Sequence, residues 1–383
     1  MTWREALERS IRSVGQLTAA VDLTPNEVAK LSAAAERHPM SITPYYLSLI
    51  DWSDPSDPIR KMAVPSGDEL SPIGSYDTSG ESENTKLPGL QHKYGPTALV
   101  LTTNRCAVYC RHCFRKRLVG LPSAEILQRF EDAALYIESH TEITNVLLSG
   151  GDPFVLPTAM LGAFLKRLDA IEHLRFIRFG TRIPVVLPER IIEDEQLLDL
   201  VRRHSRKDRR IYVVTQFNHP REITALADRA VERLLEAGAI VGNQTVLLRG
   251  VNDDPGVLSE LQGRLAGIGA TPYYVFQCRP VKRVKAGFQV SLRRGYGIVE
   301  QAKAELSGIA KRFKFVMSHR TGKIEIVGLS GDVMSFRYHE AKRTEDAGRF
   351  FRKRLAPGAG WLDDVSGGVV IDRPPEGTGL PIS

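Results

Sequence analysis

The sequence predicts an α/β fold, a partial and open (β/α)6 barrel with an N-terminal helical extension and a C-terminal extension. Two observations predict it. Short apolar runs alternate six times with amphipathic stretches, which indicates a parallel sheet covered by helices. The chain of 383 residues, 42% of them apolar and 25% charged, is long enough to bury a large core. Six units are too few for a closed barrel of eight strands, so we expect an open one.

The residues before the alternation predict a helical extension. Three helical patterns open the chain, and the second begins with a capping box of Thr24 and Glu27, with Pro25 at its first position. Residues 51–90 are rich in Pro, Ser, Gly and Asp without periodicity, which predicts a long irregular connector over the barrel surface. The expected parts are the extension and connector (1–90), the barrel (91–312) and the C-terminal segment (313–383).

The barrel is predicted from six strand-like runs, each followed by a helical pattern. The runs are "TALVLTT", "NVLLSGG", "LRFIRFG", "IYVVTQF", "AIVGNQTVLL" and "PYYVFQ". The helices are expected near 123–139, 157–170, 192–204, 221–237, 256–267 and 296–311. Such architectures bind ligands at the C-terminal ends of their strands, so we expect the functional residues in the loops that follow the strands.

Composition predicts a cytoplasmic protein. No apolar run reaches the length of about 18 residues that a membrane span needs, and acidic residues near the N-terminus argue against a signal peptide. The net charge of +7 comes from scattered residues, and the densest basic run, 202–210, closes a predicted helix. We therefore expect neither a membrane nor a nucleic acid as partner.

Three of the four cysteines lie in one short stretch, "NRCAVYCRHCFRKR", just after the first predicted strand. The spacing of Cys106, Cys110 and Cys113 offers three thiolates on one loop. A [4Fe–4S] cluster ordinarily takes four cysteine ligands, so three leave one iron open. A structural zinc ion would need a fourth ligand; Cys278 is far along the chain, and His112 stays open as that ligand.

An open iron can chelate S-adenosylmethionine, whose reductive cleavage gives a 5′-deoxyadenosyl radical. The pattern CxxxCxxC resembles the radical S-adenosylmethionine superfamily, and His112 before its last cysteine would pack on the adenine. "SGGDP", which ends the second predicted strand, resembles the superfamily segment that binds the methionine amino group; it consists of Ser149, Gly150, Gly151 and Asp152, followed by a proline.

Further segments resemble the lysine 2,3-aminomutase family, whose members move an amino group from the α to the β carbon. They are "LPGLQHKYGPTALVL", "CRHCFRKR", "SGGDP", "GTRIPVVLPERI", "FNHPREIT" and "GNQTVLLRGVND", in this order over about 90–330. The resemblance implies that Arg115 holds the substrate carboxylate and that Lys323 carries pyridoxal phosphate (PLP). Lys93 and Tyr94 would bind PLP, and His219 and Gln244 would lie on segments lining the shared cofactor cavity.

The same resemblance implies a small amino acid substrate and a reducing electron donor such as flavodoxin or ferredoxin. The chain departs from the family at four points. Arg279 and Val316 stand where lysine-specific members have aspartates, so a substrate with a second carboxylate, such as glutamate, fits better. Thr97 replaces an arginine expected to bind PLP, and the glycine-rich turn before Lys323 is reduced to "RTGK". The family's zinc-binding cysteines near the C-terminus are missing, so a homo-oligomer would form without that metal.

Two other functions stay open. The first is an enzyme with the same radical chemistry but without PLP, acting on another substrate. The second is an iron–sulfur sensor without turnover.

Overall fold

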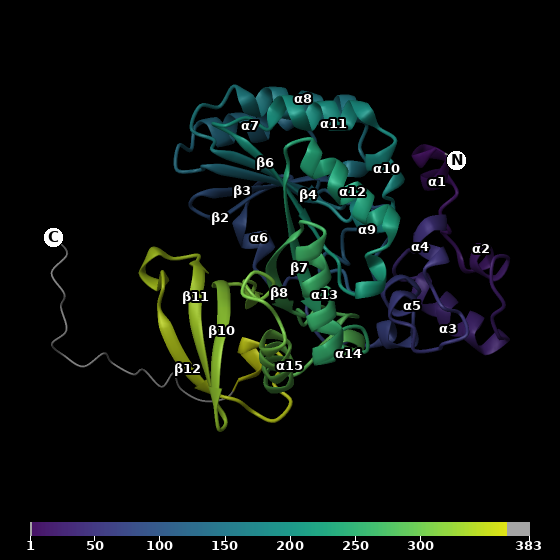
Figure 1. Ribbon diagram of the computed structural model, residues 1–383. Coiled ribbons are helices and arrows are strands. Elements are labelled where there is room, and N and C mark those ends of the chain that lie inside the picture. Colours follow the sequence, from purple (N-terminus) through teal and green to yellow (C-terminus); the bar gives the residue numbers. More distant parts are fainter. Residues whose placement is uncertain (1, 366–383) are drawn as a thin grey trace, which may run out of the picture.

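The computed structural model describes residues 2–365 and arranges them around one sheet of twelve strands (Figure 1). The strands pair in the order of the chain. They are β1 (Thr85–Leu87), β2 (Leu90–Tyr94), β3 (Thr97–Thr103), β4 (Asn145–Gly150), β5 (Phe176–Gly180), β6 (Arg210–Thr215), β7 (Ile240–Leu247), β8 (Thr271–Gln277), β9 (Lys314–His319), β10 (Gly322–Ser330), β11 (Val333–Ala341) and β12 (Phe350–Arg354).

The predicted α/β fold is confirmed. The six predicted strands are β3 to β8, and they are parallel neighbours in the expected order. A seventh parallel strand, β9, pairs with β8 and was not predicted, because its six residues follow a basic stretch and lack a long apolar run. Antiparallel strands extend both edges, β1 and β2 on one side and β10 to β12 on the other. Within residues 2–365, β1 and β12 are the two edges and the sheet stays open.

Helices cover the outer face of the parallel strands (Figure 1). They are α7 (Phe130–Glu138), α8 (Thr158–Asp169), α9 (Ile183–Val186), α10 (Glu189–Ile192), α11 (Glu195–His204), α12 (Ala225–Glu236), α13 (Pro255–Gly267), α14 (Lys285–Phe288) and α15 (Leu292–Ala304). Three begin three or more residues later than predicted, namely α7, α11 and α12. Residues before α7 are tied to the cysteine loop by an ion pair of Glu125 with Arg117, and Thr224 caps α12 by accepting from the Ala227 amide.

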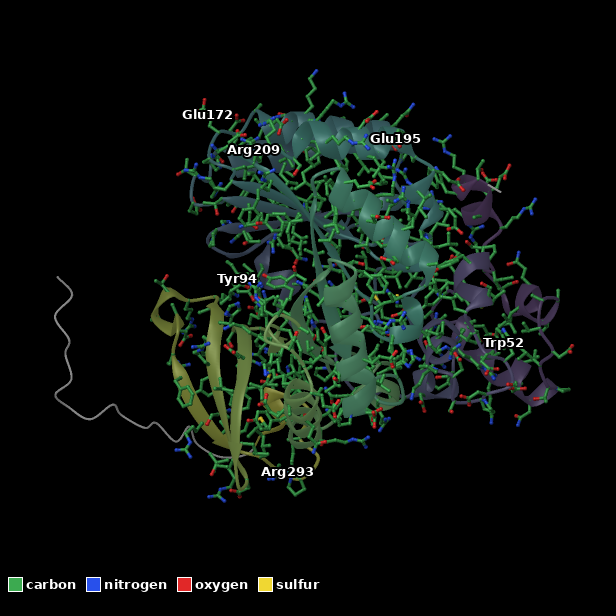
Figure 2. The ribbon with its side chains drawn as sticks, in the orientation of Figure 1. Trp52, Tyr94, Glu172, Glu195, Arg209 and Arg293 are labelled. Atoms are coloured by element: carbon green, nitrogen blue, oxygen red, sulfur yellow. The ribbon has the colours of Figure 1, made fainter. Side chains whose placement is uncertain are left out.

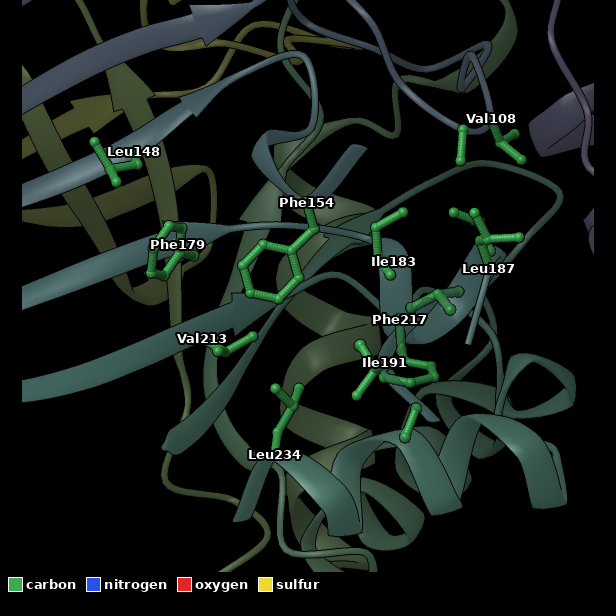
Figure 3. Packing of buried hydrophobic residues seen from close by; sticks show 14 of the residues in the cluster. Val108, Leu148, Phe154, Phe179, Ile183, Leu187, Ile191, Val213, Phe217 and Leu234 are labelled. Atoms are coloured by element: carbon green, nitrogen blue, oxygen red, sulfur yellow. The ribbon is translucent and has the colours of Figure 1, made fainter. Parts of the chain in front are cut away.

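The main core lies between these helices and the sheet. Alternate residues of the strands point outward, so Leu148, Phe179 and Val213 meet the helices while their chain neighbours face the interior of the barrel. Figure 3 shows the ring of Phe154 beside Phe179, with centroids 5.1 Å apart, and Leu234 of α12 facing them. This packing fixes the strand ends from which the functional loops start.

The N-terminal extension contains α1 (Trp3–Glu8), α2 (Val14–Thr18), α3 (Pro25–Ala35) and α4 (Pro44–Ser48). The predicted capping box of α3 is confirmed, since Thr24 and Glu27 exchange hydrogen bonds. The connector is less irregular than predicted. It contains α5 (Pro58–Ala63), the 3-10 turn η1 (Gly67–Leu70), α6 (Glu81–Asn84) and β1, which are too short to show periodicity; Asp57 starts α5 by accepting from the Arg60 amide.

The C-terminal strands pack against α15 around a second core. Phe336 and Phe351 stack there with centroids 5.3 Å apart. Four further 3-10 turns are η2 (Pro153–Val155), η3 (Pro220–Glu222), η4 (Thr344–Asp346) and η5 (Leu362–Asp364). The segment around η5 folds back on the barrel, where Gln277 donates to the carbonyl of Gly360.

Candidate functional site

A cavity of about 350 Å³ runs through the interior of the barrel, from the cysteine loop to the first residue of β3 and the hairpin of β10 and β11. It brings together all but one of the residues predicted for the site. They are Lys93, Tyr94, Cys106, Cys110, His112, Cys113, Arg115, Ser149, Gly150, Gly151, Asp152, Gln244 and Lys323. Figure 2 shows Tyr94 where the barrel meets the C-terminal strands, so both parts of the chain enclose the cavity.

His219 does not reach this cavity. Its ring accepts from the backbone amide of Arg221, and its own amide donates to the Glu222 carboxylate, so it starts the 3-10 turn η3. The segment "FNHPREIT" instead contributes Asn218, which approaches His112, and Glu222, which pairs with Arg182. No residue of this segment lines the cavity, whose lining in this part of the chain ends at Gln216. The prediction that the segment lines the cavity is therefore wrong, because chain order alone does not tell which side chains point inward.

The cysteine loop takes its shape from the N-terminal extension. The amide of Tyr109 donates to the carbonyl of Ser41, and the amide of Arg111 donates to the carbonyl of Met62. Ser41 Oγ donates back to the carbonyl of Ala107 at 2.9 Å. Backbone groups of the loop are therefore paired with a segment more than forty residues upstream, and the loop holds its form without regular structure of its own.

All three cysteines of the loop are free thiols. Burial raises the pKa of Cys106, and burial together with the Cys110 thiol raises the pKa of Cys113 to about 11. Thiolates in this site therefore need a positively charged partner. One is the guanidinium of Arg182, whose Nη1 lies 2.6 Å from Cys110 Sγ and whose other nitrogen pairs with Glu222.

His112 is a neutral ring with one unpaired nitrogen. Burial and the nearby Arg182 charge lower its pKa to about 3. Its Nε2 lies 3.3 Å from the side-chain amide nitrogen of Asn218. Its buried Nδ1 has no hydrogen-bond partner, so a ligand in the cavity can form a hydrogen bond with it.

The segment "SGGDP" joins the second strand to the cysteine loop. Gly150 has φ +111°, and a Cβ on Gly151 would lie 2.3 Å from the carbonyl oxygen of Arg105. Both glycines therefore allow the loop after β4 to lie close to the start of the cysteine loop. Asp152 is buried and accepts from Thr181 Oγ1, the Arg182 amide and the Phe154 amide. It fixes the loop after β5 beside the cysteines.

A group of charged residues lies beyond the last cysteine. Arg115 Nε donates to Glu81 at 3.2 Å, and Arg279 lies over the ring of Phe114 at 4.1 Å. Burial opposes ionisation of Glu81, but the guanidinium groups of Arg115, Arg117 and Arg279 outweigh it and lower the pKa. Burial, with the nearby charge of Arg115, lowers the pKa of Arg279 to about 10 against the opposing effect of Glu81. Glu81 belongs to the connector, where the sequence gave no signal for a functional residue.

Lys323 lies at the opposite end of the cavity on β10. Its Nζ pairs with Glu340 at 2.5 Å and lies over the ring of Tyr274 at 4.7 Å. Lys93 is nearby and donates to the carbonyls of Ser79 and His319. Burial and neighbouring cations lower the pKa of Lys93 to about 7. The predicted lysine and the predicted cysteines thus share one enclosed space, although more than 200 residues separate them in the chain.

Known proteins resemble this chain over most of its length. Residues 100–258 match the Radical SAM superfamily. A protein of Aquifex aeolicus (strain VF5), whose name places it provisionally among the L-lysine 2,3-aminomutases, is 42% identical over 346 residues, which make up 90% of this chain and 92% of that protein. The chain belongs to the lysine 2,3-aminomutase family.

Two other relatives of this aminomutase family carry different substrate names. The L-lysine 2,3-aminomutase of Clostridium subterminale is 37% identical over 309 residues, or 80% of this chain and 73% of that protein. The glutamate 2,3-aminomutase of Clostridioides difficile (strain 630) is 37% identical over 309 residues, which make up 79% of this chain and 71% of that protein. Among solved structures, a radical SAM methyltransferase from Sphaerobacter thermophilus is 19% identical, with a TM-score of 0.38 over 59% of this chain and 68% of that chain. Aminomutases are isomerases, and this chain is an enzyme of that class.

Membership of this aminomutase family implies a [4Fe–4S] cluster and S-adenosylmethionine, and the cavity fits both. Among the described residues, no three His, Cys, Asp or Glu side chains meet closely enough to hold a single metal ion. In a cubane each thiolate binds a different iron, and Cys106, Cys110 and Cys113 all line the cavity. Several buried polar atoms around the cavity also lack partners, including Gln91 Nε2, Tyr94 OH and Thr215 Oγ1. Such atoms are costly unless a polar ligand satisfies them.

No helix within residues 2–365 of this aminomutase has the length and apolar character to cross a membrane.

The loop that carries the predicted cluster ligands of this aminomutase is clamped by a buried ion triad. Glu69, with a side chain only 1% exposed, pairs with Arg111 and with Lys116, which flank the last cysteine. We expect Glu69→Gln to destabilise the protein by about 3–5 kcal/mol, because two buried cations lose their counter-charge. The midpoint of thermal unfolding measures it, and the exposed Glu305→Gln is the control. An unchanged midpoint would show that the ion pairs of Glu69 with Arg111 and Lys116 do not stabilise the protein.

The same triad predicts a pH dependence. Burial opposes ionisation of Glu69, but Lys116 and Arg111 outweigh it and keep its pKa below the ordinary 4.5. The stabilisation is therefore present above pH 4.5 and is lost as the pH falls through the lowered pKa of the folded state. Unfolding midpoints of wild type and Glu69→Gln should converge in acid.

Proposed function

We propose that this protein is a PLP-dependent amino acid 2,3-aminomutase, which moves an amino group from the α to the β carbon of a substrate with a second carboxylate. One observation carries the proposal: Lys323 lies in the cavity that contains Cys106, Cys110 and Cys113. PLP, when bound, would supply a carbon–nitrogen double bond through which an amino group can pass between neighbouring carbons in a radical reaction. The cavity would hold the cluster and S-adenosylmethionine at one end and PLP at the other.

The residues of the chain would act mainly by binding the cofactors and holding them in position. The three thiols would hold the cluster, and the neutral His112, with its unpaired Nδ1, would hold S-adenosylmethionine. The side chain of Lys323 is 12% exposed and would bind PLP covalently, with Glu340 holding the ammonium form. Enclosure keeps water from reactive species, and reactants held within one cavity react without the entropic cost of meeting in solution.

Two guanidinium groups support a substrate with two carboxylates. The Cζ atoms of Arg115 and Arg279 lie 4.5 and 4.1 Å from the ring centroid of Phe114, and both side chains line the cavity. A guanidinium binds a carboxylate through two parallel hydrogen bonds. The far ammonium of lysine would instead meet the cation of Arg279. Val316, the other position where lysine-specific members have an aspartate, is buried and does not line the cavity. The relative named glutamate 2,3-aminomutase is consistent with a dicarboxylic substrate within this family.

The function is tested by product analysis. Anaerobically reconstituted protein with PLP, S-adenosylmethionine and a strong reductant is incubated with glutamate or with lysine, and amino acids are separated by mass spectrometry. We expect a β-amino acid from glutamate and little or none from lysine. Product from lysine alone would overturn the substrate, and no product from any amino acid despite deoxyadenosine formation would favour an enzyme without PLP.

Arg279→Ala tests the substrate site itself. Loss of a charge-assisted hydrogen bond costs about 1.5–3 kcal/mol, so kcat/KM for glutamate should fall roughly 10- to 100-fold, mainly through KM. The exposed Arg293→Ala is the matched control and should leave kcat/KM unchanged. If Arg279→Ala has the kinetics of wild type, Arg279 does not contact the substrate.

A flavodoxin or ferredoxin remains our proposal for the physiological electron donor.

A further inference from the structure

Arg178 on β5 is a cavity-lining cation with unused hydrogen-bonding capacity. Its Nη2 donates to Asn145 Oδ1 at 2.7 Å, and its buried Nε has no partner. Within residues 2–365 it forms no ion pair with a carboxylate. Burial lowers the pKa of Arg178, since removal from water disfavours the charged form. A buried guanidinium that has no carboxylate partner and an unpaired Nε favours an anionic ligand.

The position of Arg178 separates it from the proposed substrate site. The carboxylate of Glu340 raises the pKa of Arg178 against the effect of burial, and Glu340 is the ion-pair partner of Lys323. Arg115 and Arg279 instead share the ring of Phe114 at the cysteine end. Arg178 therefore acts on the carboxylate that pairs with Lys323 and does not share the ring of Phe114.

Hydrogen bonds link Thr97 to Arg178 across three strands. Asn145 on β4 donates from Nδ2 to Thr97 Oγ1 at 3.1 Å, while its Oδ1 accepts from Arg178. Because β3, β4 and β5 are parallel neighbours, the guanidinium and the Thr97 hydroxyl are held on one side of the cavity. The guanidinium fork matches the oxygens of a phosphate, which a hydroxyl can also donate to.

We propose that Arg178 binds the phosphate group of PLP, with the Thr97 hydroxyl beside it. The proposal rests on the proposed function and adds the residue that recognises the phosphate. Asn145 is a positioning residue, because it orients the guanidinium and the hydroxyl together.

Equilibrium binding of PLP and of pyridoxal, which lacks the phosphate, tests this proposal. Cluster-loaded wild type and Arg178→Gln are titrated with each compound, and bound compound is measured by absorbance after dialysis. We expect Arg178→Gln to raise the Kd of PLP roughly 10- to 100-fold and to leave the Kd of pyridoxal within about twofold. Arg175→Gln, at an exposed site just before the same strand, should change neither.

Two further variants distinguish loss of phosphate binding in Arg178→Gln from a folding defect. Arg178→Lys keeps a cation without the fork and should bind PLP with intermediate affinity. Thr97→Arg, added to Arg178→Gln, should restore tight PLP binding, because it supplies a guanidinium from the neighbouring residue. If Arg178→Gln binds PLP as tightly as wild type, or weakens PLP and pyridoxal equally, the phosphate role is overturned while the aminomutase proposal stands. If wild type binds no PLP, both proposals fall.

Discussion

Cys110→Ala should abolish the iron–sulfur cluster and all reductive cleavage of S-adenosylmethionine. The variant leaves two thiols in the loop, and Arg182 loses the sulfur that its Nη1 approaches at 2.6 Å. Iron and sulfide content, visible absorbance and 5′-deoxyadenosine formation should all fall to background. The substitution removes a few atoms from a loop that is otherwise anchored by backbone hydrogen bonds, so the fold should persist.

Cys278→Ala is the matched control. Its thiol lines the same cavity, and burial raises its pKa to about 12, but it lies outside the cysteine loop. This variant should keep the cluster and the cleavage reaction. A Cys110→Ala protein that stayed brown and still formed deoxyadenosine would overturn the assignment of the loop. Loss of the cluster in Cys278→Ala would instead make Cys278 a fourth ligand.

Lys323→Ala should eliminate amino group migration while sparing the cluster. Without the lysine, PLP has no covalent anchor at this position, and turnover should fall by about 10⁴-fold or more, the scale on which loss of a catalytic side chain acts. Borohydride reduction of wild type followed by peptide mass analysis should place PLP on Lys323. Iron content in the variant should equal that of wild type.

Lys93 provides the comparison for this experiment. Its pKa is lowered to about 7, so it is more easily deprotonated, but its Nζ donates to two backbone carbonyls, at 3.1 Å to Ser79 and 2.6 Å to His319. Those two hydrogen bonds occupy the amine and keep it from reacting with PLP. Lys93→Met should therefore keep the PLP adduct on Lys323. An adduct found on Lys93 in wild type would reverse the roles of the two lysines.

The sequence predicted the parts of the site whose signal is local. The spacing of Cys106, Cys110 and Cys113 and the strand before them indicated a loop at a barrel opening, and the structure has that loop after β3. The six strands followed from alternation of apolar and amphipathic segments. The placement of Lys323 in the same cavity depended on resemblance and chain order, because no periodicity relates residues so far apart.

What the sequence could not predict depends on long-range contacts. Glu81 enters the site from a connector without periodicity, and Arg182 reaches Cys110 only because Asp152 holds the loop after β5 against the loop after β4. His219 shows the opposite case. Its segment lies beside the site, but the 3-10 turn directs its ring to the Arg221 amide. Local patterns identify loops, whereas packing decides which side chains enter the cavity.

The hydrogen bonds of the cysteine loop to Ser41 and Met62 have a consequence for how the protein matures. The upstream segment is synthesised first, yet its partners exist only after the ribosome has made the loop. The cysteine loop therefore has the conformation that receives a cluster only after Ser41 and Met62 have formed their hydrogen bonds with it. We expect cluster insertion to follow the pairing of the loop with Ser41 and Met62.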